Sequence, residues 1–291
     1  MKRIWTVITI MLLAGAPLTA VQASKQVQID ASMLVTGTVT ISTKGLVAGY
    51  KLDHPDKLPK VVVRLLSRYI PRFRFKPVMR HGKAVAGVAS MTLRLVAKPT
   101  GKGQYRISVA GFQFGSTNTA DTLREDHMPP AVYPVKERRD LVGGIVYLFL
   151  QVNRKGRVMH AYAQQVNLTE MARDPHFISQ DSMQRWRRDL ARAAVRQARK
   201  WTFKIPKKGP QASKPYWYAR IPAGFVLINN MGRPLIHHEY GQWTLYVPGP
   251  RRPIPWLTNK LLTSGSVDAQ VPGSLFTIQQ QLQLADQTKK G

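Results

Sequence analysis

An internal repeat limits the folds open to this chain more strongly than any other part of its sequence. When Lys44-Gly45 is aligned with Lys155-Gly156, residues 33–51 lie over residues 144–162 without a gap. Each copy predicts two strands joined by a tight turn that ends in glycine, because glycine readily adopts the left-handed conformation that short hairpin loops require. In the first copy, apolar residues alternate with threonine and serine, which is typical of a strand with one buried face.

Both copies continue with the same order of elements. A helix with apolar residues three and four apart is expected to begin after Asp56 in the first copy and after Ser182 in the second. Each helix is followed by an alternating aromatic segment, 73–77 or 201–206, and then by a further strand. The second copy is 17 residues longer between its turn glycine and its second aromatic, an insertion expected between residues 168 and 180. This order predicts an α+β fold of two ββαβ modules, whose small antiparallel sheets are each covered by one helix.

Composition divides the rest of the chain. The first module is expected over residues 24–115 and the second over 130–250, while the polar segment 116–129 lacks periodicity and is expected to link them. Residues 251–291 form a tail rich in proline and glycine, in which a short helix is expected to begin at Ser274.

The N-terminus has the three parts of a secretion signal. Lys2 and Arg3 precede an apolar run from Ile4 to Ala16, and small residues at Val21 and Ala23 mark a cleavage site. The run is shorter than the ~20 residues that a membrane-spanning helix needs. We therefore expect residues 1–23 to be removed and the protein to be periplasmic. The alternative is an uncleaved segment that anchors the chain in the inner membrane.

Charge and residue content narrow the classes of function. Lys and Arg number 44 against 15 Asp and Glu, and the net charge of +29 favours anionic partners and disfavours cationic ones. The absence of cysteine excludes disulfides, thiolate metal sites and a cysteine nucleophile. The few acidic residues leave little material for acid–base chemistry, and the cluster 237–239 offers too few ligands for a metal. We expect a non-enzymatic protein without catalytic residues, metal or cofactor.

The helix expected in the second copy carries a stripe of arginines. They follow one another at spacings of three, four, four and three, on the face opposite its apolar side: Arg185, Arg188, Arg192, Arg196 and Arg199. Guanidinium groups suit phosphate, so the stripe predicts a site for an anionic surface such as lipid, lipopolysaccharide or cell-wall polymer. The alternative is a solvated face of a basic protein. Nucleic acid is an improbable partner because the chain is expected to be exported, and the sequence leaves the oligomeric state open.

The second copy resembles the C-terminal domain of TonB-type energy transducers, and the first resembles a diverged version of it. The motif residues that carry the resemblance are Tyr133, Pro134, Gly144, Gly156, Trp201 and Phe203. The resemblance implies a compact ββαβ module that contacts outer-membrane receptors by adding a strand to a sheet edge. A proline-rich spacer is missing after residue 23 and the apolar segment looks cleavable, so the expected role is that of a periplasmic adaptor in energy-coupled transport. Its partner would be an envelope protein such as an outer-membrane receptor.

The first strand of the second copy is apolar on both faces. One helix covers only one face of a sheet, so Ile145, Tyr147 and Phe149 must be buried by another part of the structure. We expect the cover to come from within the chain, either from the first copy or from the tail helix, and a second chain is the alternative. Two further features argue against receptor binding by strand addition: the strand over 91–96 should pair with a following hairpin strand, and Pro222 should interrupt the last strand of the second copy.

Overall fold

The computed structural model describes residues 27–80, 82–117, 122–207, 211–235, 239–257, 266–278 and 284–285. The signal peptide expected over 1–23 lies outside these residues, as do His237 and His238 of the small acidic and histidine cluster. The fold is 19% helix and 46% strand, with small antiparallel sheets and few helices. The structure therefore confirms the mixed α+β class with small antiparallel sheets that the sequence predicted.

The first sheet is built mainly from the N-terminal half of the chain. Its strands lie in the order β12-β1-β5-β6, and β2 pairs with β1 on the same edge as β12. The elements of this half are β1 (Asp30–Ile41), β2 (Val47–Leu52), α1 (Lys60–Tyr69), β3 (Val78–Arg80), β4 (Lys83–Val85), β5 (Gly87–Gly101) and β6 (Gln104–Ser116), joined by the later strand β12 (Thr244–Tyr246). As expected, β6 pairs with β5 along its length, so residues 91–96 have no free edge.

The second sheet follows in the order β13-β11-β8-β9. Its half contains β7 (Arg124–His127), α2 (Val135–Arg139), β8 (Val142–Asn153), β9 (Val158–Met171), α3 (Gln180–Ala198), β10 (Thr202–Lys204), β11 (Tyr216–Phe225) and β13 (Phe276–Thr277). Strand β7 comes from the segment expected to be a linker, and it pairs with β10 in a separate two-stranded ribbon.

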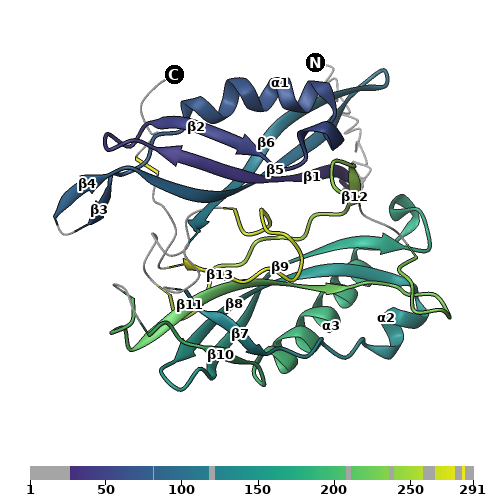
Figure 1. Cartoon of the computed structure of the whole chain (residues 1–291). Helices are drawn as coiled ribbons and strands as arrows, with labels where there is room; N and C mark the ends of the chain where they lie inside the picture. The colour runs from purple at the N-terminus through teal and green to yellow at the C-terminus, as the bar shows by residue number, and fades with distance from the viewer. Residues whose placement is uncertain are drawn as a thin grey trace, which may run out of the picture.

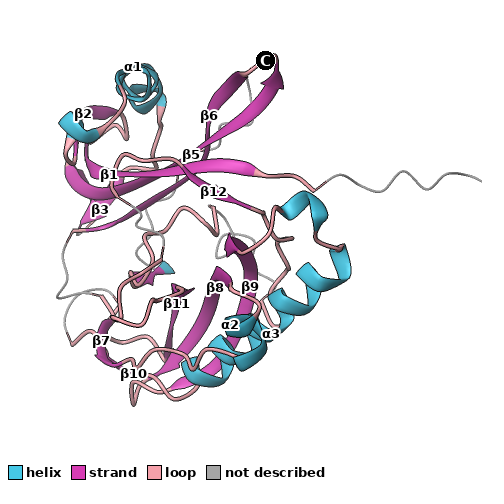
Figure 2. Ribbon diagram, turned by 90° about the vertical axis from the view of Figure 1, so that its right-hand side faces the viewer, coloured by secondary structure: helices cyan, strands magenta, loops and turns pink. Residues whose placement is uncertain are grey.

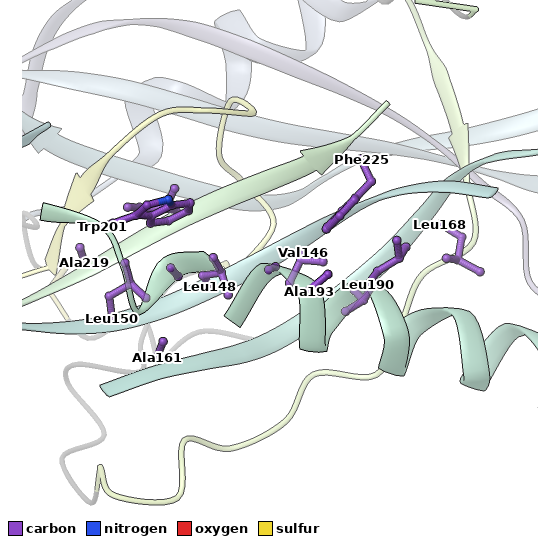
Figure 3. Close-up of a cluster of buried hydrophobic side chains, with 14 of the residues drawn as sticks. Val146, Leu148, Leu150, Ala161, Leu168, Leu190, Ala193, Trp201, Ala219 and Phe225 are labelled. Carbon is purple, nitrogen blue, oxygen red and sulfur yellow. The ribbon is translucent and has the colours of Figure 1, made fainter. Parts of the chain in front are cut away.

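The two sheets are stacked with their helices on opposite outer faces. Figures 1 and 2 show α1 outside the first sheet and α3 outside the second, and in Figure 1 the C-terminal segment runs between the sheets. The apolar stripe of each helix packs against its own sheet. Figure 3 shows this core for α3, where Leu190 and Ala193 lie over Val146 and Leu148 of β8. Burial of these stripes provides the main driving force for both layers.

A glycine turn docks on an aromatic segment in both halves. Gly45 and Gly156 have φ values of 76° and 72°. A Cβ atom on either glycine would lie 2.0 Å from the carbonyl oxygen of Phe75 or Phe203, so no other residue fits. The same two phenylalanines each donate a 2.8 Å backbone hydrogen bond to the carbonyl of the facing glycine.

The second face of β8 is covered from within the chain, as expected. Phe149 is fully buried in a cluster with Tyr218, Ile254 and Ile278, and Tyr147 is 4% exposed. The cover differs from the expected tail helix. Residues 276–277 form strand β13 on the edge of β11, and the rest of that expected helix, 279–283, lies outside the described residues.

The starts of both helices differ from the sequence prediction. Helix α1 begins after Pro59, because a separate turn of 3-10 helix occupies 55–57. Ser179 caps α3, and its hydroxyl accepts the backbone N–H of Ser182, which lies inside the first turn. The extra residues of the second copy are not a loop insertion. They lengthen β9 to 14 residues against six in β2, and α3 to 19 against ten in α1.

Pro222 does not interrupt β11, contrary to the prediction. The strand continues from Tyr216 to Phe225 with Pro222 opposite Tyr147 of β8. The carbonyl of Pro222 accepts a hydrogen bond from the N–H of Gly273, on the side away from β8. In a strand the nitrogen and carbonyl of one residue point to the same side, so proline removes no hydrogen bond from the β8–β11 ladder.

One segment joins the two sheets. Strand β12, grouped with the second copy by the sequence, pairs with β1 of the first sheet through Asp30 and Tyr246. The next residue, Val247, exchanges two backbone hydrogen bonds of 3.1 and 2.8 Å with Leu168 of β9 in the second sheet. The segment 244–247 is therefore shared by both sheets, a long-range contact that local sequence patterns do not reveal.

Candidate functional site: an arginine-lined groove

A groove of about 1260 Å³ runs beside α3 on the surface of the second sheet. One wall is the helix, the floor is the edge strand β9, and the opposite wall is formed by residues 247–252 together with Val27 and Gln28. Pockets for small ligands measure roughly 300–1,000 Å³. The groove is therefore large enough for an extended ligand.

Helix α3 turns an arginine-rich face toward the groove. Its apolar residues pack inward, which leaves the neighbouring positions, three and four apart, along the wall. Four of the five arginines predicted from the sequence line the groove: Arg188, Arg192, Arg196 and Arg199. Arg185 does not line it. Two arginines that were not predicted also lie there, Arg187 from the same helix and Arg252 from the opposite wall.

The floor and the far wall are largely apolar. Small and branched side chains of β9 and the 247–252 segment form them: Ala161, Ala163, Val166, Val247, Pro248 and Pro250. Ala191 and Val195 of α3 add to the apolar lining. Among the described lining residues there is no carboxylate. The groove thus combines an apolar base with a cationic rim.

The far wall is fixed closely against β9. The N–H of Gly249 donates to Oδ1 of Asn167 at 3.0 Å, and the N–H of Arg252 donates to the carbonyl of Gln164 at 2.8 Å. A Cβ atom on Gly249 would lie 1.9 Å from the carbonyl oxygen of Val166. Glycine is therefore required where this wall approaches the strand.

Arg187 lies at the contact between α3 and the far wall. Its Nη2 donates to the carbonyl of Pro248 at 3.2 Å and to that of Val247 at 3.5 Å. Burial lowers the pKa of the Arg187 guanidinium. Its Nε is buried and has no hydrogen-bond partner among the described residues. A partly desolvated cation with an unused donor is costly unless an anion neutralises it.

Most of the groove arginines lack a carboxylate partner. Arg192 pairs with Asp189, whereas within the described part of the chain Arg188, Arg196 and Arg199 form no ion pair. Partial burial disfavours the ionised form of Asp189, but hydrogen bonds from Arg192 and Glu137 hold its pKa below the ordinary value. The Asp189 carboxylate is therefore already engaged, and the remaining guanidinium groups are available to a ligand.

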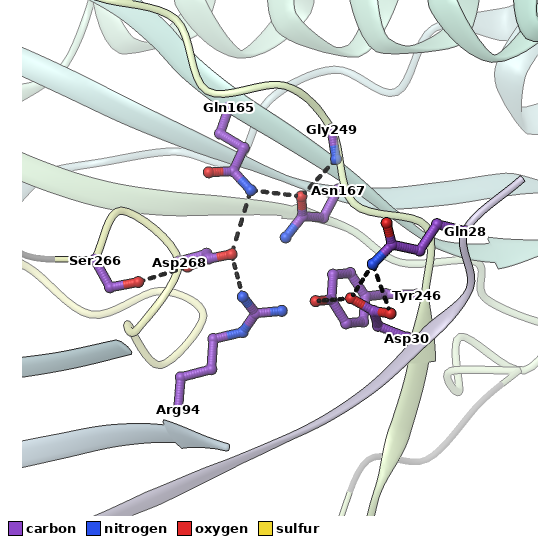
Figure 4. A network of polar contacts seen from close by, with 9 residues as sticks. All are labelled: Gln28, Asp30, Arg94, Gln165, Asn167, Tyr246, Gly249, Ser266 and Asp268. Carbon is purple, nitrogen blue, oxygen red and sulfur yellow. Dashed lines mark hydrogen bonds and ion pairs between the residues drawn. The ribbon is translucent and has the colours of Figure 1, made fainter. Parts of the chain in front are cut away.

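A buried polar network supports the far wall from behind. Asp268 pairs with Arg94 of the first sheet and accepts a 3.2 Å hydrogen bond from Gln165 of β9. Gln165 in turn donates to Asn167, the residue that holds Gly249 (Figure 4). The guanidinium of Arg94 also lies 4.5 Å from the centre of the Tyr246 ring. No local pattern in the sequence indicates this network, because its members lie far apart in the chain.

The six motif residues on which the resemblance was based support the structure of the second half and do not line the groove. The Tyr133 hydroxyl donates to the carbonyl of Val142 at 2.6 Å, and burial raises its pKa. Pro134 precedes the first turn of α2, and a Cβ on Gly144 would lie 2.6 Å from the carbonyl of Asn167. Trp201 Nε1 donates to the carbonyl of Pro129 at 2.9 Å, and Phe203 is buried against the Gly156 turn.

The described residues include no group of three or more His, Asp or Glu side chains placed to hold a metal ion. No helix in the described ranges is long and apolar enough to cross a membrane.

Comparisons with protein-family models, curated proteins and solved structures found no match.

Proposed function

We propose that this chain is a non-enzymatic binding protein of the cell envelope, and that its groove holds an anionic ligand. The observation that carries the proposal is the convergence of six arginines from two walls on one groove that contains no described carboxylate. Like charges so close together repel one another, and an anion bound between them removes that repulsion. Export of the protein is inferred from the signal-peptide pattern of residues 1–23.

Salt-dependent binding to vesicles tests the proposal. The triple variant Arg188→Gln, Arg192→Gln, Arg196→Gln should bind vesicles rich in anionic phospholipid more weakly than the unaltered protein, most clearly at low ionic strength. A matched control removes three exposed cations, also spaced four apart, from α1: Lys60→Gln, Arg64→Gln, Arg68→Gln. Equal losses in both variants would show that net charge alone drives binding and would refute the groove.

A second candidate function follows from the resemblance to TonB-type domains. We propose that the two halves are diverged ββαβ modules and that the protein acts as a periplasmic adaptor for an outer-membrane receptor. The supporting observation is that both halves dock a turn glycine on an aromatic segment with the same hydrogen bond.

Crosslinking in intact cells tests the adaptor function. Among the described strands β2 pairs with β1 alone, so its outer edge is a suitable place for a photo-crosslinking residue at the exposed positions Ala48 or Lys51. Specific capture of an outer-membrane receptor would support this candidate. Capture of no such receptor from β2, with a crosslinker at the exposed Lys60 of α1 as control, would count against it.

A further inference from the structure

We propose that the occupant of the groove is a linear polyanion with at least three phosphate or carboxylate groups in succession, lying parallel to α3. This inference rests on the proposed function and narrows the class of its ligand. A single anionic headgroup would leave most of the arginines unneutralised.

The spacing of the arginines supports an extended ligand. An α-helix rises about 1.5 Å per residue, so Arg188, Arg192 and Arg196 follow one another at about 6 Å, and the row reaches Arg199 after about 16 Å. Side chains four residues apart are direct neighbours, whereas those at the two ends of this row are not. One small anion can therefore bridge two of these arginines, but the whole row requires a series of anions.

The shape of the groove favours a linear polymer over a membrane surface as the ligand. Arg252 and Pro248 stand on the wall that faces α3, and the apolar floor lies between the two walls. A flat bilayer could reach the exposed arginines of α3 but not the buried floor residues Ala161 and Val166. A narrow polymer can enter it and place its uncharged parts against the floor while its anions face the arginines.

Nucleic acid is also a linear polyanion, but the lining does not suit it. Proteins that bind single strands provide aromatic side chains on which successive bases stack. Among the described lining residues Tyr162 is the only aromatic one, and most of the others outside the arginines are small aliphatic residues, glutamine and proline. The observations therefore favour a polymer without stacking bases, such as a phosphate-linked or acidic glycan.

Arg187 provides an anchoring point where α3 contacts the far wall of the groove. Its guanidinium is oriented by the carbonyls of Val247 and Pro248 and is partly desolvated. An anion gains more from a fixed, desolvated guanidinium than from a mobile one in water. One anionic group of the polymer is therefore expected to contact Arg187.

Probes of increasing length test the inference on the signal-free chain 24–291. Orthophosphate, tripolyphosphate and long-chain polyphosphate are compared by calorimetry, together with polygalacturonate as a carboxylate polymer and an oligo-dT as the nucleic acid. Affinity is expected to increase at least tenfold from orthophosphate to tripolyphosphate and again to the long chain, and to fall steeply with salt because each neutralised arginine adds to the salt dependence. Arg196→Gln with Arg199→Gln should lower affinity for the polymer at least tenfold, while Arg64→Gln with Arg68→Gln on α1 should leave it within twofold.

The outcomes separate the inference from the proposed function. If orthophosphate or anionic vesicles bind as tightly as the polymer at equal concentrations of anionic groups, the groove is a site for a single anion. This result would overturn the inference and leave the proposed function intact. Tighter binding of oligo-dT than of a polyphosphate of equal charge would overturn the choice of polymer. If the groove variants bind every anionic probe like the unaltered protein, both the inference and the proposed function fail. Circular dichroism of each variant confirms that it is folded.

Discussion

Breaking the ion pair between Arg94 and Asp268 should be one of the most destabilising single changes at the junction between the two sheets. The two side chains are 7% and 12% exposed. In addition to Arg94, the carboxylate of Asp268 accepts hydrogen bonds from Gln165 at 3.2 Å and Ser266 at 2.8 Å. The change Asp268→Asn keeps the shape of the side chain, removes its charge and leaves a buried guanidinium without its carboxylate.

The expected loss can be estimated from this geometry. Removing one partner of a buried ion pair costs about 3–5 kcal/mol, because the other charge stays buried and uncompensated. A domain is usually stable by roughly 5–15 kcal/mol, so a loss of this size should be clear in urea unfolding at neutral pH. Replacing both partners, as Arg94→Met with Asp268→Leu, should restore much of the stability, since no buried charge then remains.

An exposed ion pair in the same chain provides the control. Lys204 and Asp126 are 3.7 Å apart with side chains 61% and 45% exposed. Surface pairs contribute about 0–1 kcal/mol, so Asp126→Asn should change the free energy of unfolding by less than about 1 kcal/mol. If Asp268→Asn destabilises the protein no more than Asp126→Asn does, the buried network does not stabilise the junction and the reasoning is wrong.

Three further predictions concern burial, pH and processing. Tyr147→Ala with Phe149→Ala should cost several kcal/mol, at about 3–5 for each fully buried aromatic, and an unchanged melting temperature would contradict their burial. Burial raises the pKa of Glu170 above its ordinary value of 4.5. The protonated side chain therefore stabilises the fold fully at low pH, and this stabilisation is lost as the pH rises through the raised pKa. Urea unfolding across this pH range should show the loss in the unaltered protein and not in Glu170→Gln. N-terminal sequencing of the exported protein should find Ser24 first, whereas an intact Met1 would indicate an uncleaved anchor.

Local signals in the sequence were sufficient for much of the fold. The hairpins around Gly45 and Gly156 were predicted because a glycine between two alternating segments is typical of a tight hairpin turn, and both glycines are left-handed. The two apolar faces of β8 correctly required a cover from within the chain. These predictions succeeded because each depends on a pattern within about twenty residues or on the simple rule that apolar faces are buried.

Predictions that needed long-range contacts were less successful. The sequence placed 242–247 within the second module, 130–250, but pairing with β1 depends on which edge is free when the halves meet. Pro222 was judged by its missing N–H alone, whereas its effect depends on which side of the strand that nitrogen faces. Helix starts were also displaced: Ser179 caps α3 in place of Ser182, and α1 begins after Pro59 without a side-chain cap because a 3-10 turn occupies 55–57.

For the candidate site too, local patterns were predicted correctly and long-range contacts were missed. Helical spacing alone indicated that Arg188, Arg192, Arg196 and Arg199 share a face. The stripe could not show whether that face was open to solvent or formed a wall. The groove exists only because residues 247–252 return to the edge of β9, and nothing near Arg252 in the sequence indicates this. Arg187 was overlooked because it lies one position off the stripe.

The extra length of the second copy explains how the groove forms in this half. Aligned on the turn glycines, β2 corresponds to residues 158–163 of β9, so 164–171 have no counterpart in the first half. Aligned on the aromatic segments, the first residue of α1 corresponds to Arg188, so residues 180–187 of α3 are also extra. The added strand residues hold the far wall through the backbone of Gln164 and Leu168, and the added helical turns bring in Arg187. The lengthening of one strand and one helix thus places the exposed arginine face of α3 beside a second wall, and the two together form the groove.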